Sequence, residues 1–293
     1  MSHIEKLTQI AKVASENGRD YSKVINVKPI QGGSINEAYY VQTEDAEYFM
    51  KFHSEAPKGF FKSEAIGLRI IKETGTIAVP NYLSYSDQSG NAFLLLEWIN
   101  GEKTVETEER FGRKLADLHK TFGQMHGFKD DTYIGLLPQP NELKANWLEY
   151  YRDFRLQSQL NQGIDRGVIT GERRQRMETL LGKLDEWIPR FVEPSHLHGD
   201  LYNGNWIVGP GGEPYIVDPS FLYGDRHFEI AFSEMFGGLP KKFYKAYNEN
   251  FPLREDYEDI KELYQLYYLL AHLNLFGESY GNSVDTILKK YVG

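Results

Sequence analysis

The stretch HGDLYNGNWIVGPGGEPYIVDPS, residues 198–220, holds the features that decide the fold of this chain. It begins with a polar segment rich in glycine and asparagine, which offers little to a packed core. Two short apolar runs follow, separated by a Gly-Pro-Gly-Gly turn, and this arrangement predicts a small β-hairpin. Asp200 and Asn205 precede the hairpin and Asp218 follows it. A hairpin is a compact way to bring residues 205 and 218 to one place.

The spacing of these polar residues is that of the catalytic loop in protein-kinase-like enzymes, where H-x-D-L-x-x-x-N is followed by a second aspartate. Asp200 can accept the proton of a substrate hydroxyl. Asn205 and Asp218 offer the hard oxygen donors that Mg²⁺ prefers. Taken singly, Asp and Asn in a glycine-containing loop are ordinary turn formers, so the interpretation rests on the spacing. We expect His198 to be structural and to hydrogen-bond the backbone.

A kinase must also bind ATP, and the first third of the chain offers residues for this. Gly32 and Gly33, followed by Ser34, lie in a turn between apparent strands, where backbone N–H groups could approach phosphates. A glycine pair in an ordinary hairpin is the alternative. Lys51 lies on the following strand and Glu64 on the next expected helix. A strand lysine is often a solvated edge charge, but one paired with a helical glutamate directs its ammonium at the α- and β-phosphates.

An adenine site is expected where the apolar strand FLLLEWINGE, residues 93–102, leaves the first lobe. Backbone groups from Glu97 to Ile99 could pair with the adenine edge there. The expectation rests on position, because adenine would be bound through the main chain and no side chain identifies the contact.

The pattern of apolar residues divides the chain into two regions. Residues 24–99 read mostly as strands, with one internal helix that Gly75 ends. Helical periodicity dominates afterwards, over roughly 106–122, 141–161, 170–190, 226–236, 240–250, 255–276 and 283–291. The prediction is an α+β, bilobal, protein-kinase-like fold. Residues 1–98 would form an N-terminal ATP-binding lobe with an antiparallel sheet, and residues 99–293 a mostly helical catalytic and substrate lobe.

Composition narrows the classes of partner. The chain has 293 residues, a formal net charge of -9 and no cysteine. The negative charge makes a broad nucleic-acid-binding surface a poor expectation. The lack of cysteine excludes disulfides and a cysteine nucleophile, and suits a cytoplasmic protein. No apolar run approaches the length of a membrane span, and the N-terminus lacks the apolar core of a signal peptide, so no membrane association is expected.

Several blocks beyond the catalytic loop resemble those of the fructosamine 3-kinase family, also called ketosamine 3-kinases, whose fold is similar to that of aminoglycoside phosphotransferases and protein kinases. The segment DPS followed by YGDRHFEIA is discriminating, because protein kinases have D-F-G and a later A-P-E instead. The similarity covers most of residues 30–277, and its blocks are KSEAIGLRII, LADLHK, YIGLLPQPN, NWLEYYRDFRLQSQL, HGDLYNGN, IVDPSFLYGDRHFEIAFSEMFGG and LYQLYYLLAHLNLFG.

The resemblance implies a specific reaction: ATP- and Mg²⁺-dependent phosphorylation of the C3 hydroxyl of a ketoamine. The acceptor would be a ribulosamine, erythrulosamine or fructosamine adduct on a small amine or a protein lysine. The phosphorylated adduct then decomposes and releases the amine, which is deglycation. The roles that the resemblance assigns are base for Asp200, magnesium ligands for Asn205 and Asp218, phosphate ligand for Lys51, partner of that lysine for Glu64, and support of the catalytic loop for Glu229.

Two positions depart from the family pattern. The family commonly reads H-G-D-L-W-S-G-N, whereas this chain has Tyr202 and Asn203. Tyr202 is expected to line the sugar side, so the substrate preference could differ. Some members carry a cysteine in the glycine turn, where this chain has Ser34, so regulation through a thiol is not expected.

Other functions share much of this pattern. An aminoglycoside phosphotransferase would need an acidic cleft, which the net charge permits, and a choline or homoserine kinase would need a smaller pocket. The long blocks at 133–160 and 221–238 favour the ketosamine alternative. A catalytically silent nucleotide-binding scaffold would ordinarily lack the base or the metal ligands, and all of them are present here.

Overall fold

The computed structural model of this chain describes residues 3–18, 22–31 and 35–293, with the side chains of the first helix described from residue 8 onward. Its contacts separate two compact units. The first unit consists of Met1–Thr107 and Ile207–Asp218, and the second of Glu108–Trp206 and Pro219–Gly293. The assignment of ATP binding to residues 1–98 and of catalysis to residues 99–293 stays a prediction.

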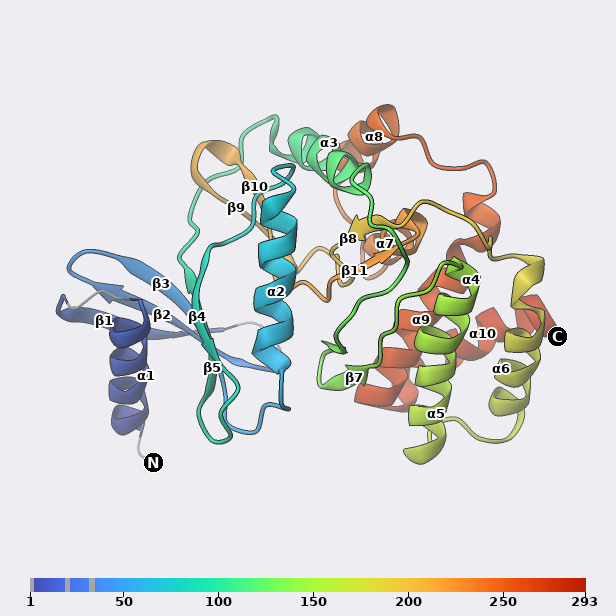
Figure 1. Ribbon diagram of the computed structural model, residues 1–293, viewed down its shortest axis with the longest axis horizontal. Helices are drawn as coiled ribbons and strands as arrows, with labels where there is room; N and C mark the ends of the chain where they lie inside the picture. The colour runs from blue at the N-terminus through green and yellow to red at the C-terminus, as the bar shows by residue number, and fades with distance from the viewer. Residues whose placement is uncertain (1–2, 19–21, 32–34) are drawn as a thin grey trace. The chain divides into compact units, whose positions relative to one another are not determined.

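The first unit is built on a five-stranded sheet with the strand order β1-β2-β3-β5-β4. Every neighbouring pair is antiparallel, as the runs of alternating apolar residues predict. Figure 1 shows the first helix, α1, and the second, α2, on opposite faces of this sheet. The elements are α1 (His3–Asn17), β1 (Val24–Ile30), β2 (Glu37–Thr43), β3 (Glu47–His53), α2 (Phe60–Glu73), β4 (Tyr82–Ser86) and β5 (Ala92–Glu97).

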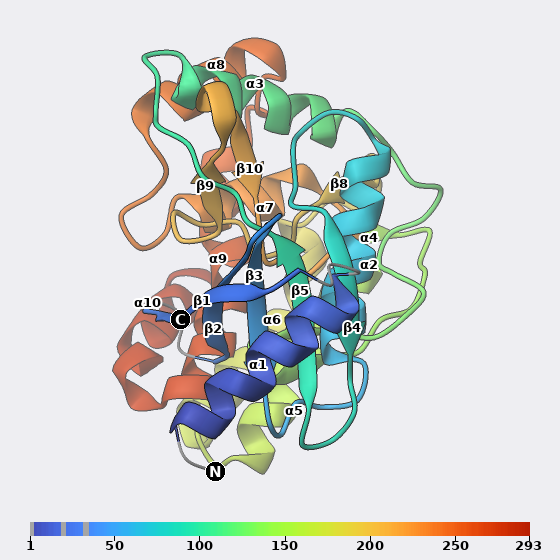
Figure 2. The same cartoon turned by 90° about the vertical axis from the view of Figure 1, so that its left-hand side faces the viewer.

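The α1 face of the sheet carries an apolar core. Ile10 and Ala14 of α1 pack there against Met50 and Phe52 of β3, among other buried residues of β2 and β5. Figure 2 shows α1 lying across this face. Because successive side chains of a strand point to opposite faces, Lys51, between Met50 and Phe52, must point to the α2 face.

Helix α2 covers the other face of the sheet, and its N-terminus is capped by a residue that lies outside the helix, far along the sequence. The Asp87 carboxylate accepts hydrogen bonds from the N–H groups of Phe61 at 2.8 Å and Lys62 at 3.2 Å, which satisfies two donors of the first turn. At the other end Gly75 adopts a φ of 67° and its N–H bonds to the carbonyl of Lys72. The predicted helix stop at Gly75 is therefore confirmed.

The hairpin expected between Asn205 and Asp218 is present as β9 (Trp206–Val208) and β10 (Pro214–Ile216). Its residues from 207 onward belong to the first unit, where Ile216 N–H donates to the carbonyl of Ala78 at 3.0 Å. Gly101 approaches the hairpin closely. A Cβ atom at Gly101 would lie 1.9 Å from the carbonyl oxygen of Gly209, so only glycine fits.

The second unit is mostly helical, and α9 is its centre, in contact with α5, α7 and α10. Two pairs of three-residue strands, β6–β7 and β8–β11, complete it. The elements are α3 (Thr107–His119), β6 (Thr132–Ile134), β7 (Leu137–Gln139), α4 (Trp147–Tyr150), a π-helical segment (Tyr151–Leu156), α5 (Gln157–Asp165), α6 (Gly171–Lys183), β8 (Ser195–Leu197), β11 (Leu222–Gly224), α7 (Arg226–Ser233), α8 (Lys241–Asn250), α9 (Tyr257–Phe276) and α10 (Gly281–Val292).

The predicted fold class is confirmed, and each expected helical block has a counterpart. One detail differs, because the block at 141–161 is not a uniform α-helix: its middle turn is π-helical. The four short strands of the second unit were also not expected, since three residues are too few to establish a strand period. Within the described part of the chain, no helix has the length and apolar character needed to span a membrane.

Candidate active site

Lys51 and Glu64 meet on the α2 face of the sheet. Lys51 Nζ lies 2.8 Å from Glu64 Oε1, and both side chains are buried. A buried ammonium without a partner would be costly, so the pair explains why a lysine can stand in the middle of β3. The pairing expected from the sequence is therefore present in the first unit.

Asp218, which follows β10, joins this pair. Its Oδ1 lies 2.5 Å from Lys51 Nζ, so the ammonium sits between two carboxylates. Burial by itself lowers the pKa of Lys51, but the charges of Asp218 and Glu64 outweigh it and raise the pKa above its ordinary value. Burial also raises the pKa of Glu64, which the Lys51 ammonium opposes. The lysine is thus held positively charged.

The backbone at Asp218 is strained. Its φ is 62°, in the left-handed region that residues other than glycine seldom adopt. Aspartate tolerates this region better than most residues, yet such conformations persist only where the surroundings impose them. The side chain is still 42% exposed while it contacts Lys51. Strain at a partly exposed carboxylate beside a buried ammonium is typical of a functional position rather than of a turn former.

The catalytic-loop candidate, in the second unit, is held closed by its own residues. Asn205 Nδ2 donates to the carbonyl of Asp200 at 2.8 Å and to its Oδ2 at 3.2 Å. His198 is fully buried, and its Nδ1 accepts the N–H of Asp200 at 3.2 Å, so its predicted bond to the backbone is confirmed. Gly199 has a φ of 84°, and a Cβ there would lie 1.9 Å from the carbonyl oxygen of Ser220. The loop geometry thus depends on glycine at 199.

Side chains from two helices fix Gly199 from both directions. Its N–H donates to Glu229 Oε2 at 2.6 Å, and its carbonyl accepts from the Tyr268 hydroxyl at 2.9 Å. Glu229 Oε1 in turn lies 2.9 Å from Nε2 of His119, which is fully buried at the end of α3. The contact of Glu229 with the catalytic loop is the one the sequence led us to expect. His119 and Tyr268 were missed, and the polar residue that ends the apolar face of LADLH was the signal that could have found His119.

The donors expected for a magnesium ion suit that ion chemically. Both acceptors near the Asn205 amide belong to Asp200, so the NH₂ group must face them and Oδ1 is directed elsewhere. No hydrogen bond to this oxygen occurs within the described residues. Asn205 Oδ1 and the Asp218 carboxylate are hard oxygen ligands, and Mg²⁺ is usually bound by one or two protein groups plus phosphate oxygens and water. A site with only two protein ligands agrees with the described residues, which contain no cluster of three or more His, Asp or Glu side chains arranged for a metal.

The remaining predicted residues fall in three places. Gly32, Gly33 and Ser34 lie outside the described residues. At the end of β5, the N–H of Glu97 is bonded to the carbonyl of Asn81, whereas no hydrogen bond of the Ile99 N–H is found in the described part of the chain. Ile99 is therefore the better placed of the two as a backbone donor.

Tyr202, the expected substrate residue, lies in the same loop as Asp200. Its ring lies 6.0 Å from that of Phe232, at the C-terminal part of α7. Phe232 stacks in turn on Tyr268 with 3.7 Å between ring centroids. The tyrosine ring is thus one end of an aromatic row on the loop that carries Asp200.

A strand lysine paired with a helical glutamate, an H-G-D-L-x-x-x-N loop and a strained aspartate after a short hairpin define a phosphotransferase of the protein-kinase-like class. Comparison with known proteins agrees with this class and narrows it. The fructosamine kinase family matches residues 6–293, and the chain belongs to this family. It is therefore a kinase.

Relatives and solved structures support the assignment along the whole chain. A protein of Enterococcus faecium named a probable ketoamine kinase is 37% identical, over 90% of this chain and 95% of its own length. The chloroplastic protein-ribulosamine 3-kinase of Arabidopsis thaliana is 33% identical over 98% of this chain and 84% of that protein. A fructosamine-3-kinase candidate from Haemophilus somnus has a TM-score of 0.87 at 28% identity, covering 99% of both chains. The aminoglycoside phosphotransferase APH(4)-Ia shares the fold alone, with a TM-score of 0.64 at 13% identity over 98% of this chain and 99% of its own.

Proposed function

We propose that this protein is an ATP- and Mg²⁺-dependent ketosamine 3-kinase. Its acceptor is the C3 hydroxyl of a ribulosamine, erythrulosamine or fructosamine adduct, carried by a small amine or by a protein lysine. The phosphorylated adduct decomposes and releases the amine, which makes the reaction a step of deglycation. The observation that carries the proposal is the buried Lys51–Glu64 pair with Asp218 beside it, which offers a fixed ammonium and a partly exposed carboxylate to a nucleotide.

Each residue of the proposed site has one task. The Lys51 ammonium contacts the α- and β-phosphates, with Glu64 fixing its direction. Asp218 and the Oδ1 atom of Asn205 hold Mg²⁺, which neutralises charge on the phosphates when bound. The backbone of the Glu97–Ile99 segment, with the free Ile99 N–H as donor, pairs with the adenine edge. Nucleotide binding then requires Asp218 to exchange part of its contact with Lys51 for the cation.

Asp200 acts at the acceptor. Its carboxylate accepts the proton of the C3 hydroxyl as that oxygen forms a bond to the γ-phosphorus, and the bond from phosphorus to the β-phosphate oxygen breaks to release ADP. Little further covalent chemistry is required of the protein, so catalysis comes mainly from positioning and charge neutralisation. The hydrogen bond from Asn205 Nδ2 to Asp200 Oδ2 fixes the direction of the carboxylate. Tyr202, in the same loop, lines the sugar.

The proposal is tested by offering the full chain one acceptor at a time. With Mg·ATP, ribuloselysine and fructoselysine are expected to give ADP and a sugar 3-phosphate that phosphorus NMR identifies, whereas kanamycin and choline are expected to give neither. Release of ADP with kanamycin or choline but not with the ketoamines would replace the proposed substrate class. No ADP with any acceptor, together with intact Mg·ATP binding, would favour a nucleotide-binding scaffold.

A further inference from the structure

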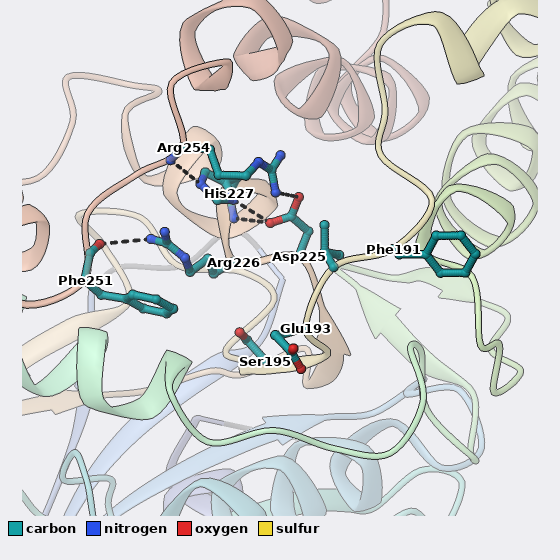
Figure 3. Close-up of a pocket in the computed structure, with 9 residues that line it drawn as sticks. Phe191, Glu193, Ser195, Asp225, Arg226, His227, Phe251 and Arg254 are labelled. Carbon is teal, nitrogen blue, oxygen red and sulfur yellow. Dashed lines mark hydrogen bonds and ion pairs between the residues drawn. The ribbon is translucent and has the colours of Figure 1, made fainter.

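The second unit contains a pocket that the proposed reaction does not use. It has a volume of about 410 Å³, within the range of small-molecule sites. The N-terminal end of α7, the segment before β8 and the loop after α8 surround it, as Figure 3 shows. The residues that line it are Phe191, Val192, Glu193, Ser195, Asp225, Arg226, His227, Phe251 and Arg254.

Arg226 is a buried cation of this pocket without a carboxylate partner. Only 7% of the residue is exposed, and its guanidinium bonds to the Tyr247 hydroxyl and the carbonyls of Phe251 and Pro252. The guanidinium also lies over the Phe251 ring, 3.7 Å from its centroid. Among the described residues, no Asp or Glu forms an ion pair with Arg226. Because dipoles and a ring compensate a buried charge only in part, a ligand anion would be stabilised beside it.

Arg254 supplies a second cation with a free donor. Its Nη1 lies 3.0 Å from Asp225 Oδ2 and its Nε 3.0 Å from Asp256 Oδ1. Its Nη2 is buried and has no hydrogen-bond partner within the described residues. Asp225 has no capacity left for a ligand, because it also accepts bonds from the Tyr264 hydroxyl and from the backbone and ring of His227. The unsatisfied nitrogen is therefore the position where a carboxylate would gain most.

Glu193 and the aromatic residues of the pocket indicate which groups the ligand has besides a carboxylate. Glu193 lines the pocket from the side opposite Arg254 in Figure 3, and no described residue pairs with its carboxylate. A simple anion would meet repulsion there, whereas a molecule with both charges would not. Phe191, which is 81% exposed, and Phe251 add apolar surface. Exposed aromatic side chains beside a polar pocket are typical of ligand-binding sites.

We propose that this pocket binds a free amino acid and that its occupancy changes the activity of the enzyme. The α-carboxylate bonds to Arg254 Nη2 and lies beside the Arg226 guanidinium. The ammonium group lies at Glu193, and an apolar or aromatic side chain packs on Phe191. The charges fit this class of ligand because two arginines and two carboxylates line the pocket, and Asp225 is already fully bonded.

A continuous row of buried hydrogen bonds connects this pocket with the catalytic loop inside the second unit. Arg226 Nη1 donates to the Tyr247 hydroxyl at 3.1 Å, and that hydroxyl lies 2.7 Å from His119 Nδ1. His119 Nε2 lies 2.9 Å from Glu229, which accepts the N–H of Gly199 at 2.6 Å. A ligand that draws the Arg226 guanidinium toward itself therefore acts on the residue next to Asp200.

The pocket wall touches the same row at a second point. Ser195 Oγ donates to the main-chain carbonyl of His119 at 2.7 Å, and both residues are buried. Networks of this kind have few alternative arrangements, because each polar atom needs a partner. Occupancy is thus expected to change kcat, through the orientation of the catalytic loop, more than the KM for ATP.

Binding is tested on the full chain by calorimetry with the standard amino acids, and with two analogues of phenylalanine. L-phenylalanine is expected to bind saturably, and 3-phenylpropionate and 2-phenylethylamine about tenfold more weakly, since each lacks one charge. Glu193→Gln is expected to weaken L-phenylalanine about tenfold and to strengthen 3-phenylpropionate, whose carboxylate the Glu193 charge repels, and Phe191→Ala to weaken both. Glu186→Gln, an exposed glutamate outside the pocket, is the matched control. No saturable binding by any amino acid, or equal binding by Glu193→Gln, would overturn the site.

Coupling is tested with Tyr247→Phe, which removes only the hydroxyl between Arg226 and His119. In the parent protein the bound amino acid is expected to change kcat about fivefold, at the low end of usual coupling strengths. In Tyr247→Phe the amino acid still binds but no longer changes kcat. A bound amino acid without effect on the parent's kcat would overturn the regulatory role. The kcat measurement rests on the proposed kinase function, whereas the calorimetric binding experiment does not. Failure of the amino-acid site and failure of the proposed function can therefore be distinguished.

Discussion

The two groups of candidate site residues are held in place by different forces. In the first unit, Lys51, Glu64 and Asp218 are joined by ion pairs. In the second unit, hydrogen bonds from buried residues of α7 and α9 fix the backbone beside Asp200. A charged group can rearrange when a triphosphate arrives, because its partners are exchangeable ions. A backbone fixed on both sides keeps one geometry, as a catalytic base requires.

The largest effect should follow from removing the carboxylate of the proposed base, Asp200, while its loop stays intact. Asp200→Asn keeps the backbone carbonyl that Asn205 binds but loses the proton acceptor. We expect kcat to fall by about 10³-fold, within the range for general-base catalysis. Calorimetry should show unchanged Mg·ATP binding, because the variant keeps Lys51, Asn205 and Asp218, to which the contacts with the nucleotide and its cation are assigned.

The control for this variant is Asp165→Asn, an exposed aspartate at the end of α5, which should keep full activity. An Asp200→Asn protein that retains more than about a tenth of the activity would remove Asp200 from its role as base. Loss of Mg·ATP binding in that variant would instead show that Asp200 also contributes to nucleotide binding. The two groups of residues would then not have the separate roles assigned to them.

The ion-paired group should respond as one set. Lys51→Met is expected to lower kcat/KM about 100-fold, and Glu64→Gln about tenfold, because Glu64 acts by directing the lysine. The double variant should then be little worse than Lys51→Met, since residues that act through one another are not additive. Steady-state kinetics at varied Mg·ATP measure all three, and melting temperatures identify any loss of folding. Effects that simply add would mean that Glu64 contributes independently of Lys51.

Low pH should reduce the folding stability of the second unit, because several histidines are buried in it. Burial lowers the pKa of His126 to about 4, against the opposing charge of Asp225, and burial also lowers the pKa of His196, His227 and His272. A histidine whose pKa is lower in the folded state is neutral there, so protonation favours unfolding and stability falls as the pH drops below about 6.5. His126 alone should cost about 2 kcal/mol between pH 7 and pH 5.

Urea unfolding at the two pH values measures this loss, and hydrogen exchange locates it in residues 108–206 and 219–293. His126→Phe keeps a ring next to Trp147 and should reduce the pH dependence by about 2 kcal/mol. An unchanged slope in this variant would show that His126 is not the group that titrates. Faster exchange in the first unit instead would reverse the expected difference between the units.

How much could be predicted from the sequence also differs between the two groups. Lys51 and Glu64 could be paired in advance, because strand alternation places one and helical periodicity the other. Asp200, Asn205 and Asp218 were predicted to be site residues from their spacing around a hairpin. The sequence could not predict that hairpin residues 207–218 belong to the first unit. Their place there depends on Tyr215 lying beside Ala78, more than a hundred residues earlier in the chain.

The support of the catalytic loop was predictable only in part. The resemblance assigned Glu229 to the support of the catalytic loop. Its partner His119, however, is separated from it by 110 residues in the sequence, and His119 is separated by 128 residues from its other partner, Tyr247. Local patterns carry no information on such contacts, because a polar residue on an apolar helix face could pair with any buried group. The strain at Asp218 is likewise a property of the folded backbone, which residue type alone does not reveal.

The smallest effect should come from the hydrogen bonds that hold the loop. Glu229→Gln keeps the length and one acceptor oxygen, so it can bond either Gly199 or His119 correctly but not both in the same way. We expect kcat to fall about tenfold with an unchanged KM for Mg·ATP, because positioning of Asp200 is affected and the ion-paired group is not. Glu234→Gln, a more exposed glutamate just after α7, is the control. A merely structural role for Glu229 would lower the melting temperature and leave kcat per folded molecule unchanged, whereas a positioning role lowers kcat itself.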